Sequence, residues 1–155
     1  PIIYIEYSER FQKALKKVFA EVPVEQLSER TNMHITLDDQ LKNIPLSPME
    51  EIHLIQIARE ASQNAINHSK GNTLKISLIQ NSDMDIELSI QDDGIGLPAN
   101  PEKLNHYGMA IMEERSKHLT GNLSIKSSRY NGTIVSLKFT PQYMLEHSSE
   151  AKKAC

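Results

Sequence analysis

Apolar residues recur at helical spacing in the first quarter of the chain and again in a central segment. In the first quarter, Ser8 precedes the pattern as a predicted N-cap and Pro23 ends it. The apolar positions of this helix are Phe11, Ala14, Leu15, Val18, Phe19 and Val22. The central helix begins with Ser47 as N-cap, a proline at the first helical position and a glutamate three residues after the cap. We expect it to continue to about His68.

Alternating and β-branched apolar positions predict strands on both sides of the central helix. The expected strands cover residues 33–37, 73–80, 85–91, 123–127 and 133–139. Turns at residues 81–84 and 129–132 join the last four strands into two hairpins. Residues 24–30 form either a short helix or a bend, and residues 38–46 form a loop.

A further helix is expected between the two hairpins, over residues 108–120, with Gly121 as its C-cap. These elements predict an α+β fold, a two-layer sandwich in which a mixed, mostly antiparallel sheet carries its helices on one face. We divide the chain into an N-terminal helix and first strand (residues 1–46), a core (residues 47–140) and a tail (residues 141–155). The tail offers little to bury, so we expect it to be disordered.

Composition and charge exclude several classes of protein. The 155 residues suggest one domain with a substantial core. With 17 Lys+Arg against 20 Asp+Glu the net charge is -3, and no basic stripe interleaves with aromatic residues, so we expect no nucleic-acid partner. The only cysteine, Cys155, excludes a disulfide framework within the chain, which suits a reducing cytosol.

The chain shows no sign of a membrane span. No run approaches the roughly 18 consecutive apolar residues that a span needs, so we expect no direct membrane contact by this segment. The first residues are apolar and lack an initiator methionine. We therefore expect the chain to be part of a longer protein, which could itself be anchored in a membrane.

Glu60, Asn64 and His68 share one side of the central helix, because they follow one another at intervals of four residues. This row borders the apolar arc that should face the sheet. An amide oxygen from Asn64 together with phosphate oxygens is enough for Mg²⁺, which keeps several waters. Glu60 could act as a general base toward a nucleophile. An ordinary solvated helix face is the alternative for the same row.

The segment from Asp92 to Gly96 reads Asp-Asp-Gly-Ile-Gly and enters a turn at the end of a strand. A carboxylate at Asp92 can accept the amino group of adenine, while Gly94 and Gly96 let the backbone approach a flat ring. The pattern also occurs in calcium loops and tight hairpins. Its order and spacing relative to the row on the central helix predict an ATP site.

Gly108 opens a helix whose free N–H groups favour an anion, so the segment from His106 to Met109 is a natural phosphate seat. A simple helix-start turn at Gly108 and core packing of Met109 would explain the same residues without a ligand. Gly132 and Thr133 begin the last strand and can equally be a hairpin signal.

Together these segments resemble the ATP-binding domain of bacterial sensor histidine kinases, within the superfamily that includes gyrase, the ninety-kilodalton heat-shock chaperone and the mismatch-repair ATPases. Residues 59–69 resemble the N box of that family, residues 92–96 its G1 box and residues 106–115 its G2 box. The last of these is similar to the nitrate/nitrite sensor subgroup. The resemblance covers residues 47–140, and residues 1–46 only loosely.

The resemblance implies a Bergerat-type ATP-binding fold that takes ATP and Mg²⁺. Glu60 would be the general base and Asn64 the Mg²⁺ ligand. Asp92 would accept the adenine amino group, with Thr133 as a helper at the same ring, and His68 would lie near the phosphates. The residues that would let the lid and the following helix approach the nucleotide are Gly94, Gly96 and Gly108.

Two features depart from the family pattern, and the short lid fits the nitrate/nitrite sensor subgroup better than the chaperone or gyrase branches. Asn67 stands where close relatives usually carry lysine, which removes a positive charge from the phosphates. The lid, residues 97–105, is short, which suggests an open, mobile site. No histidine of the chain is followed by an acidic residue, as the phosphoacceptor of this subgroup is. We therefore expect the acceptor on an upstream dimerisation and phosphoacceptor domain of the same protein, with a response regulator as a further partner.

The expected function is thus the catalytic, ATP-binding part of a histidine kinase, a cytoplasmic domain whose parent is anchored in the bacterial inner membrane. A Rossmann oxidoreductase is excluded, because Pro98 interrupts the Gly-x-Gly-x-x-Ala pattern and the strands pair as hairpins. A P-loop enzyme is excluded, because no Gly-Lys-Ser/Thr occurs. The alternative that stays open is a degenerate module of the same fold that acts through nucleotide or protein binding without kinase activity.

Overall fold

The computed structural model describes residues 3–6, 33–41, 44–81, 84–129 and 131–147. The expected helix from Ser8 to Pro23 and the undecided residues 24–30 lie outside these described residues. Within the described ranges, no helix combines the length and the apolar character that crossing a bilayer requires.

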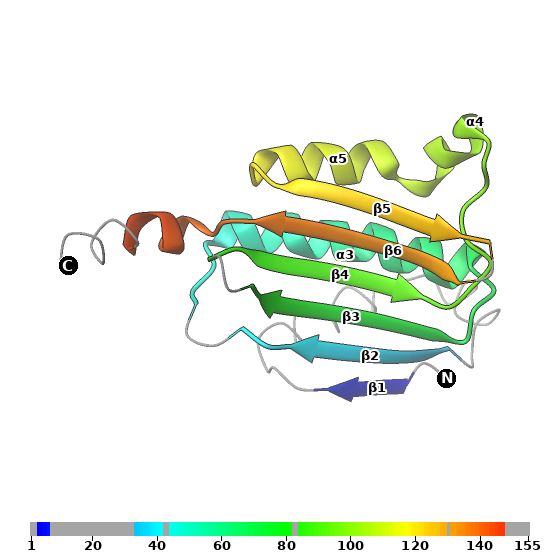
Figure 1. Ribbon diagram of the computed structural model, residues 1–155, viewed down its shortest axis with the longest axis horizontal. Helices are drawn as coiled ribbons and strands as arrows, with labels where there is room; N and C mark the ends of the chain where they lie inside the picture. Colours follow the sequence, from blue (N-terminus) through cyan, green and yellow to red (C-terminus); the bar gives the residue numbers. More distant parts are fainter. Residues whose placement is uncertain (1–2, 7–32, 42–43, 82–83, 130, 148–155) are drawn as a thin grey trace.

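One mixed sheet of six strands forms the first layer of the molecule (Figure 1). The strands are β1 (Ile3–Glu6), β2 (His34–Asp39), β3 (Thr73–Gln80), β4 (Ile86–Asp92), β5 (Asn122–Ser128) and β6 (Gly132–Phe139). In space they follow the order β1, β2, β3, β4, β6, β5. β1, β2 and β3 run parallel, whereas β3 with β4, β4 with β6 and β6 with β5 pair antiparallel. The expected α+β sandwich with a mixed, mostly antiparallel sheet is confirmed.

In the described part of the chain, the helices α3 (Pro48–His68) and α5 (Met109–His118) lie on one face of the sheet and form the second layer (Figure 1). α3 packs on β3 and β4, and α5 packs on β5 and beside α3. Two short elements, α4 (Pro101–Leu104) and η1 (Asn105–Tyr107), lie on the segment that leads from β4 into α5. The helical layer therefore brings the end of α3 next to the start of α5.

The start of α3 is the predicted capping box. Ser47 Oγ accepts the N–H of Glu50 at 3.1 Å, and Glu50 Oε1 accepts the N–H of Ser47 at 2.8 Å. Pro48 occupies the first helical position. α3 then crosses over the sheet between β2 and β3, which is why these two strands can run parallel.

Alternate residues of the strands face the helices and form the core. The paired residues Ile76 and Ile90, and Leu78 and Leu88, are buried side by side on β3 and β4. The buried apolar residues of α3 are Leu54, Ile57, Ala58, Ala61, Ala65 and Ile66. Small alanines in the second half of α3 let the helix lie close to the sheet, so the polar residues beside them also lie close to β4.

The prediction that Gly121 is the C-cap of α5 is wrong, because the helix ends earlier in the chain. α5 ends at His118, and Thr120 takes the positive φ of 51° that was expected of Gly121. The N–H of Gly121 donates to Ser116 O at 2.9 Å and so still closes the end of the helix. Glycine is needed here for space, because a Cβ would lie 2.8 Å from Leu137 Cδ1.

The start of the tail is also more ordered than expected. Residues 142–147 are helical rather than disordered. The N–H of Gln142 donates to Glu50 Oε2 at 2.9 Å, which ties this segment to the first turn of α3. Residues 148–155 lie outside the described residues.

Candidate functional site

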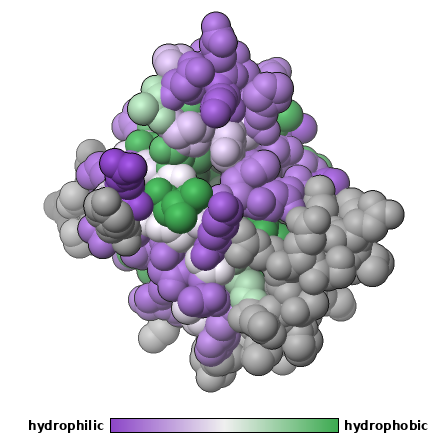
Figure 2. Space-filling view, turned by 90° about the vertical axis from the view of Figure 1, so that its right-hand side faces the viewer, coloured by the Kyte–Doolittle hydropathy of each residue, from purple (hydrophilic) through white to green (hydrophobic). Residues whose placement is uncertain are grey.

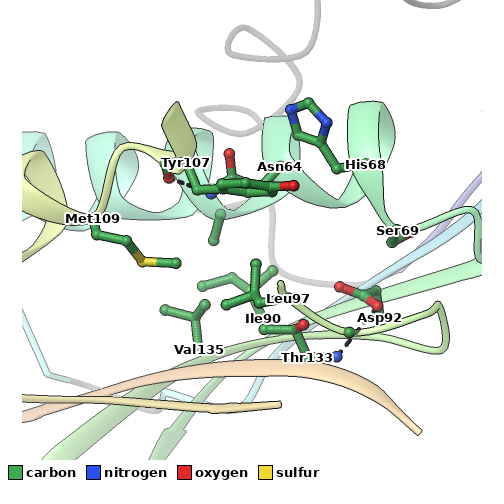
Figure 3. A pocket seen from close by; sticks show the side chains of 12 residues that line it. Asn64, His68, Ser69, Ile90, Asp92, Leu97, Tyr107, Met109, Thr133 and Val135 are labelled. Atoms are coloured by element: carbon green, nitrogen blue, oxygen red, sulfur yellow. Dashed lines mark hydrogen bonds between the residues drawn. The ribbon is translucent and has the colours of Figure 1, made fainter. Parts of the chain in front are cut away.

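A pocket opens where β4 ends and β6 begins, between the sheet and the second half of α3. It is lined by Ala61, Asn64, His68, Ser69, Ile90, Asp92, Gly96, Leu97, Tyr107, Met109, Thr133 and Val135 (Figure 3). Figure 2 shows the end of the molecule that carries these elements as a mainly hydrophilic surface with a hydrophobic patch near its centre. The pocket therefore joins apolar side chains of the sheet to polar side chains of α3 and of the turn after β4.

Asp92 is the buried carboxylate of the pocket. Only 7% of its surface is exposed, and Oδ1 accepts the N–H groups of Gly94 at 2.9 Å and Thr133 at 3.3 Å. Burial raises the pKa of Asp92; the two backbone hydrogen bonds oppose this, and the net effect is a raised pKa. Figure 3 shows the second carboxylate oxygen directed toward the pocket interior. The backbone thus holds the carboxylate and leaves an acceptor for an N–H of a ligand.

Asp93, the next residue, anchors the loop between α3 and β3. Its Oδ1 accepts the N–H groups of Asn72 at 2.8 Å and Thr73 at 2.9 Å. Burial acts to raise the pKa of Asp93, but these hydrogen bonds outweigh burial and lower it. Asp93 therefore has a structural role, and an amide oxygen could accept the same two bonds.

Gly94 lets the turn after β4 lie against the end of α3. A Cβ at this position would lie 2.1 Å from Ser69 O and 2.5 Å from Ser69 Cβ. The N–H of the following residue, Ile95, donates to the same Ser69 oxygen at 2.7 Å. The close approach of this turn to Ser69 explains why position 94 is a glycine. The same contact makes the end of α3 part of the pocket wall.

Gly96 and Gly132 bring the ends of β5 and β6 to the pocket. Gly96 has a φ of 82°, and a Cβ on it would lie 2.7 Å from Ser127 Oγ. At Gly132 a Cβ would lie 2.1 Å from the backbone oxygen of Asp92. The missing side chain at Gly132 is what allows the N–H of Thr133 to reach the Asp92 carboxylate.

The opposite wall is built from α3 and η1. Asn64 Nδ2 donates to the backbone oxygen of Tyr107, and the ring centroids of His68 and Tyr107 lie 4.6 Å apart. Figure 3 shows Tyr107 on the opposite side of the pocket from Ile90 and Val135. Because the amide nitrogen of Asn64 is bound to the protein, its Oδ1 is the atom that a cation would use.

Glu60 lies at the edge of the pocket, against the residue that precedes α5. Gly108 has a φ of 67°, and a Cβ on it would lie 2.3 Å from Glu60 Oε2. Glycine is therefore required at Gly108 by conformation and by space. Glu60 is half-buried and lies one turn of α3 before Asn64, so its carboxylate is near any cation that Asn64 binds.

Most of the predicted site residues come together. The predicted residues that line the pocket are Asn64, His68, Asp92, Gly96, Met109 and Thr133. Glu60, Gly94 and Gly108 lie beside it through the contacts described above. His106 does not join them, because it is exposed on η1 and outside the lining, whereas its neighbour Tyr107 lines the pocket. The expected phosphate seat from His106 to Met109 therefore contributes Tyr107 and Met109 instead of His106.

Three positioning residues were not predicted. Ser69 and Leu97 line the pocket, and Ser127 Oγ accepts the N–H of Leu97 at 2.6 Å. A serine after a helix and a serine on a strand carry no local signal for such a role. Only the pairing of β5 with β6 brings Ser127 to the turn after β4.

The side chains that line the pocket fit a purine nucleotide. Ile90, Val135 and Met109 offer apolar surface to a flat ring, and Asp92 offers an acceptor to an amino group. The described part of the chain holds no group of three or more His, Cys, Asp or Glu side chains that could hold a metal ion. Asn64 would therefore bind Mg²⁺ only with phosphate oxygens and water to complete the octahedron.

Comparison with known proteins gives the same picture. Residues 49–143 match the family described as "Histidine kinase-, DNA gyrase B-, and HSP90-like ATPase". The "Sensor protein NarQ homolog" of Haemophilus influenzae is 37% identical over 126 residues, which are 81% of this chain and 21% of that protein. The "Nitrate/nitrite sensor protein NarX" of Escherichia coli K12 is 37% identical over 122 residues, 79% of this chain and 20% of that protein. The chain spans about a fifth of the length of these curated relatives.

Solved structures share the fold. A histidine kinase domain from the Erythrobacter litoralis EL346 blue-light activated histidine kinase superposes with a TM-score of 0.68 at 16% identity, over 88% of this chain and 63% of that one. The catalytic domain of the histidine kinase ThkA superposes with a TM-score of 0.66 at 15% identity, over 88% of this chain and 97% of that one. At these identities the likeness concerns the fold alone.

Proposed function

Because the chain belongs to the family of histidine kinase-, DNA gyrase B- and HSP90-like ATPases, we propose that it is the ATP-binding catalytic part of a bacterial sensor histidine kinase. It transfers the γ-phosphoryl group of MgATP to a histidine on a separate helical domain of the same protein. The observation that carries this proposal is the buried Asp92 carboxylate at the floor of an apolar pocket, with Asn64 on the opposite wall.

Adenine recognition rests on Asp92. Two backbone N–H groups hold Oδ1, so the second oxygen is oriented to accept the adenine amino group without reorganisation. Thr133, whose own N–H makes one of these bonds, offers a hydroxyl at the same ring. Burial raises the pKa of Asp92, and because this role needs the ionised carboxylate, nucleotide affinity should weaken as pH falls through that pKa.

Phosphate binding rests on α3. Asn64 Oδ1 is the ligand that the protein offers to Mg²⁺, and His68 lies one turn further along the same helix. When bound, Mg²⁺ neutralises charge on the transferring phosphoryl group and orients it. The short segment through α4 and η1 covers the nucleotide as a lid that α3 holds through Tyr107.

Phosphoryl transfer rests on Glu60. An imidazole nitrogen of the acceptor histidine forms the new P–N bond while the bond between the γ-phosphorus and its bridging oxygen breaks, and ADP leaves. Glu60 takes the proton that the imidazole loses, or orients the ring by a hydrogen bond. Glu60 is only half-buried and lies beside Gly108 at the edge of the pocket, where a partner domain would meet its carboxylate.

The names of the relatives support a proposal for the wider role of the parent protein. Two of them are named as a nitrate/nitrite sensor and as a homologue of NarQ. We infer that the parent protein signals nitrate or nitrite, that its catalytic part is cytoplasmic, and that an anchor in the bacterial inner membrane and a phosphoacceptor domain lie outside this chain. A response regulator then takes the phosphoryl group from the acceptor histidine.

Asn67 favours a second candidate, a degenerate module that binds nucleotide or protein without transferring phosphate. It lies half-buried on α3 and outside the pocket lining, at a position where the resemblance expects lysine. Without that positive charge, MgATP affinity is lower. The two candidates differ in whether phosphate reaches a histidine.

One experiment separates them. MgATP is titrated into the chain, and the purified helical domain that carries the acceptor histidine is then added with labelled ATP. Acid-labile, base-stable phosphate on the helical domain supports the kinase. Nucleotide binding without transfer supports a degenerate module that binds nucleotide, and the absence of any nucleotide binding would overturn the kinase and leave a module that acts through protein contacts.

A further inference from the structure

Ser127 connects the turn after β4 to the hydroxyl of Thr133, although it lies on β5 at the edge of the described sheet. Its Oγ accepts the N–H of Leu97 at 2.6 Å and lies 3.3 Å from Thr133 Oγ1. Gly96 packs so closely that a Cβ there would lie 2.7 Å from the same Oγ. Leu97 and Thr133 line the pocket, whereas Ser127 does not. Ser127 therefore acts on the pocket only through its neighbours.

The chemistry of the three groups gives this chain of hydrogen bonds a direction. A backbone N–H can only donate, so Ser127 Oγ is the acceptor in its bond with Leu97. A hydroxyl that accepts a hydrogen bond becomes a stronger donor, because successive bonds polarise one another. Either hydroxyl could donate in the contact between Ser127 and Thr133, and the bond from Leu97 favours Ser127 as the donor, which leaves the Thr133 proton free to point into the pocket.

We propose that Ser127 is a positioning residue that makes the Thr133 hydroxyl a donor toward the bound base, and that it thereby sets the preference of the pocket for adenine over guanine. This inference rests on the proposed function, since it needs a purine nucleotide in the pocket. Ser127 does not touch the base itself. Its effect is confined to the direction of one hydroxyl group.

Adenine and guanine differ in the groups that Asp92 and Thr133 would meet. Adenine carries an amino donor beside a ring nitrogen that accepts, whereas guanine carries a carbonyl oxygen beside a ring nitrogen that donates. An acceptor at Asp92 beside a donor at Thr133 matches adenine at both atoms and opposes guanine at both. A Thr133 hydroxyl that is free to rotate could accept from guanine, so one of the two discriminating contacts would be lost.

The test compares Ser127→Ala with wild type by isothermal titration calorimetry, using MgATP and MgGTP. We expect the ATP affinity to fall about three- to tenfold, which is the range of one neutral hydrogen bond, and the GTP affinity to stay the same or rise, because the freed hydroxyl can accept from guanine. Ser128→Ala is the matched control, because the side chain of the next strand residue points to the other face of the sheet. Ser127→Thr keeps a hydroxyl and should restore the preference for ATP.

Two results would overturn the proposal. One is an unchanged ratio of ATP to GTP affinity in Ser127→Ala, and the other is an equal loss for both nucleotides, which a purely structural role in the turn would cause. A Thr133→Val background gives an independent check that does not depend on the stability of one variant: there Ser127→Ala should not change the ratio further. Failure of the proposed function looks different, because wild type itself would then bind neither nucleotide.

Discussion

The two walls of the pocket are built in different ways. On the sheet wall, backbone N–H groups of Gly94 and Thr133 hold the Asp92 carboxylate, which is buried. On the helical wall, Asn64 and Glu60 are half-buried, and their side chains meet the end of η1 and the residue after it, at the Tyr107 carbonyl and at the Gly108 Cα. Backbone hydrogen bonds therefore hold the sheet wall, whereas the helical wall depends on where Tyr107 and Gly108 lie.

This difference matches two tasks. Recognition of a base needs an acceptor and a donor at fixed positions, and groups that the backbone holds need no reorganisation when the ligand arrives. Phosphoryl transfer needs groups that adjust as a partner domain enters and as a lid closes. Substitutions on the sheet wall should therefore change affinity, and those on the helical wall should change transfer.

The largest expected effect tests the helical wall. Glu60→Gln should lower the rate of phosphate transfer to the helical domain by about 10²- to 10⁴-fold, because the general base is lost. MgATP affinity, measured by calorimetry, should change less than about twofold. Glu87→Gln, a half-buried carboxylate on β4, is the matched control and should alter neither value. An equal loss of affinity and rate would mean that Glu60 holds the nucleotide, and the division between the walls would fail.

On the sheet wall, Asp92→Ala should weaken MgATP binding by about a hundredfold, since a hydrogen bond to a charged group contributes about 1.5–3 kcal/mol. Asp93→Asn is the control, because an amide oxygen can accept the same two N–H groups and the position lies outside the pocket lining. Normal binding by Asp92→Ala would show that adenine sits elsewhere.

Asn67→Lys should change the MgATP affinity by a smaller amount than Asp92→Ala does. A lysine here would add a positive charge at the helical wall, where the phosphates are expected, and should tighten MgATP binding about two- to fivefold. Adenosine, which carries no phosphate, should bind equally well to both proteins. Unchanged MgATP affinity would show that position 67 does not face phosphate.

The smallest expected effect is a difference between Asp92 and Asp93 in how the free energy of unfolding depends on pH. The pKa of Asp92 is raised above 3.8, so the folded state binds the carboxyl proton more tightly than the unfolded state does. The contribution of Asp92 to the free energy of unfolding therefore falls as pH rises from 3.8 through the folded pKa. Nucleotide affinity should change in the opposite sense, and weaken as pH falls through the same range. The pKa of Asp93 is lowered, so its stabilising contribution is present above 3.8 and is lost as pH falls through the folded pKa.

Urea unfolding at a series of pH values checks these signs, with Asp92→Asn and Asp93→Asn as the comparison. Relative to wild type, Asp92→Asn should remove a contribution that declines with rising pH. Asp93→Asn should remove one that grows. The same sign in both variants would contradict the difference in environment between the two neighbouring residues.

Structural features that depend only on residues close together in the sequence were predictable. The capping box of Ser47 and Glu50 and the alternation along β3 and β4 are local signals, and the structure confirms both. The parallel pairing of β2 with β3 was not predictable, because α3 separates the two strands and no local pattern encodes a partner across a crossover. The end of α5 was misplaced by two residues, because Gly121 serves packing against β6 while Thr120 takes the left-handed conformation.

The sequence by itself identified Glu60, Asn64 and Asp92 as candidate site residues, because Glu60 and Asn64 share a helical period and Asp92 begins a glycine-rich turn at the end of a strand. Only the tertiary structure decided how these groups behave. Burial raises the pKa of Asp92, and the Tyr107 carbonyl accepts a hydrogen bond from the side-chain nitrogen of Asn64. Ser127 Oγ accepts a hydrogen bond from the N–H of Leu97, which lies 30 residues away in the chain. Such properties follow from desolvation and from contacts between distant segments, and residue spacing along the chain carries no record of either.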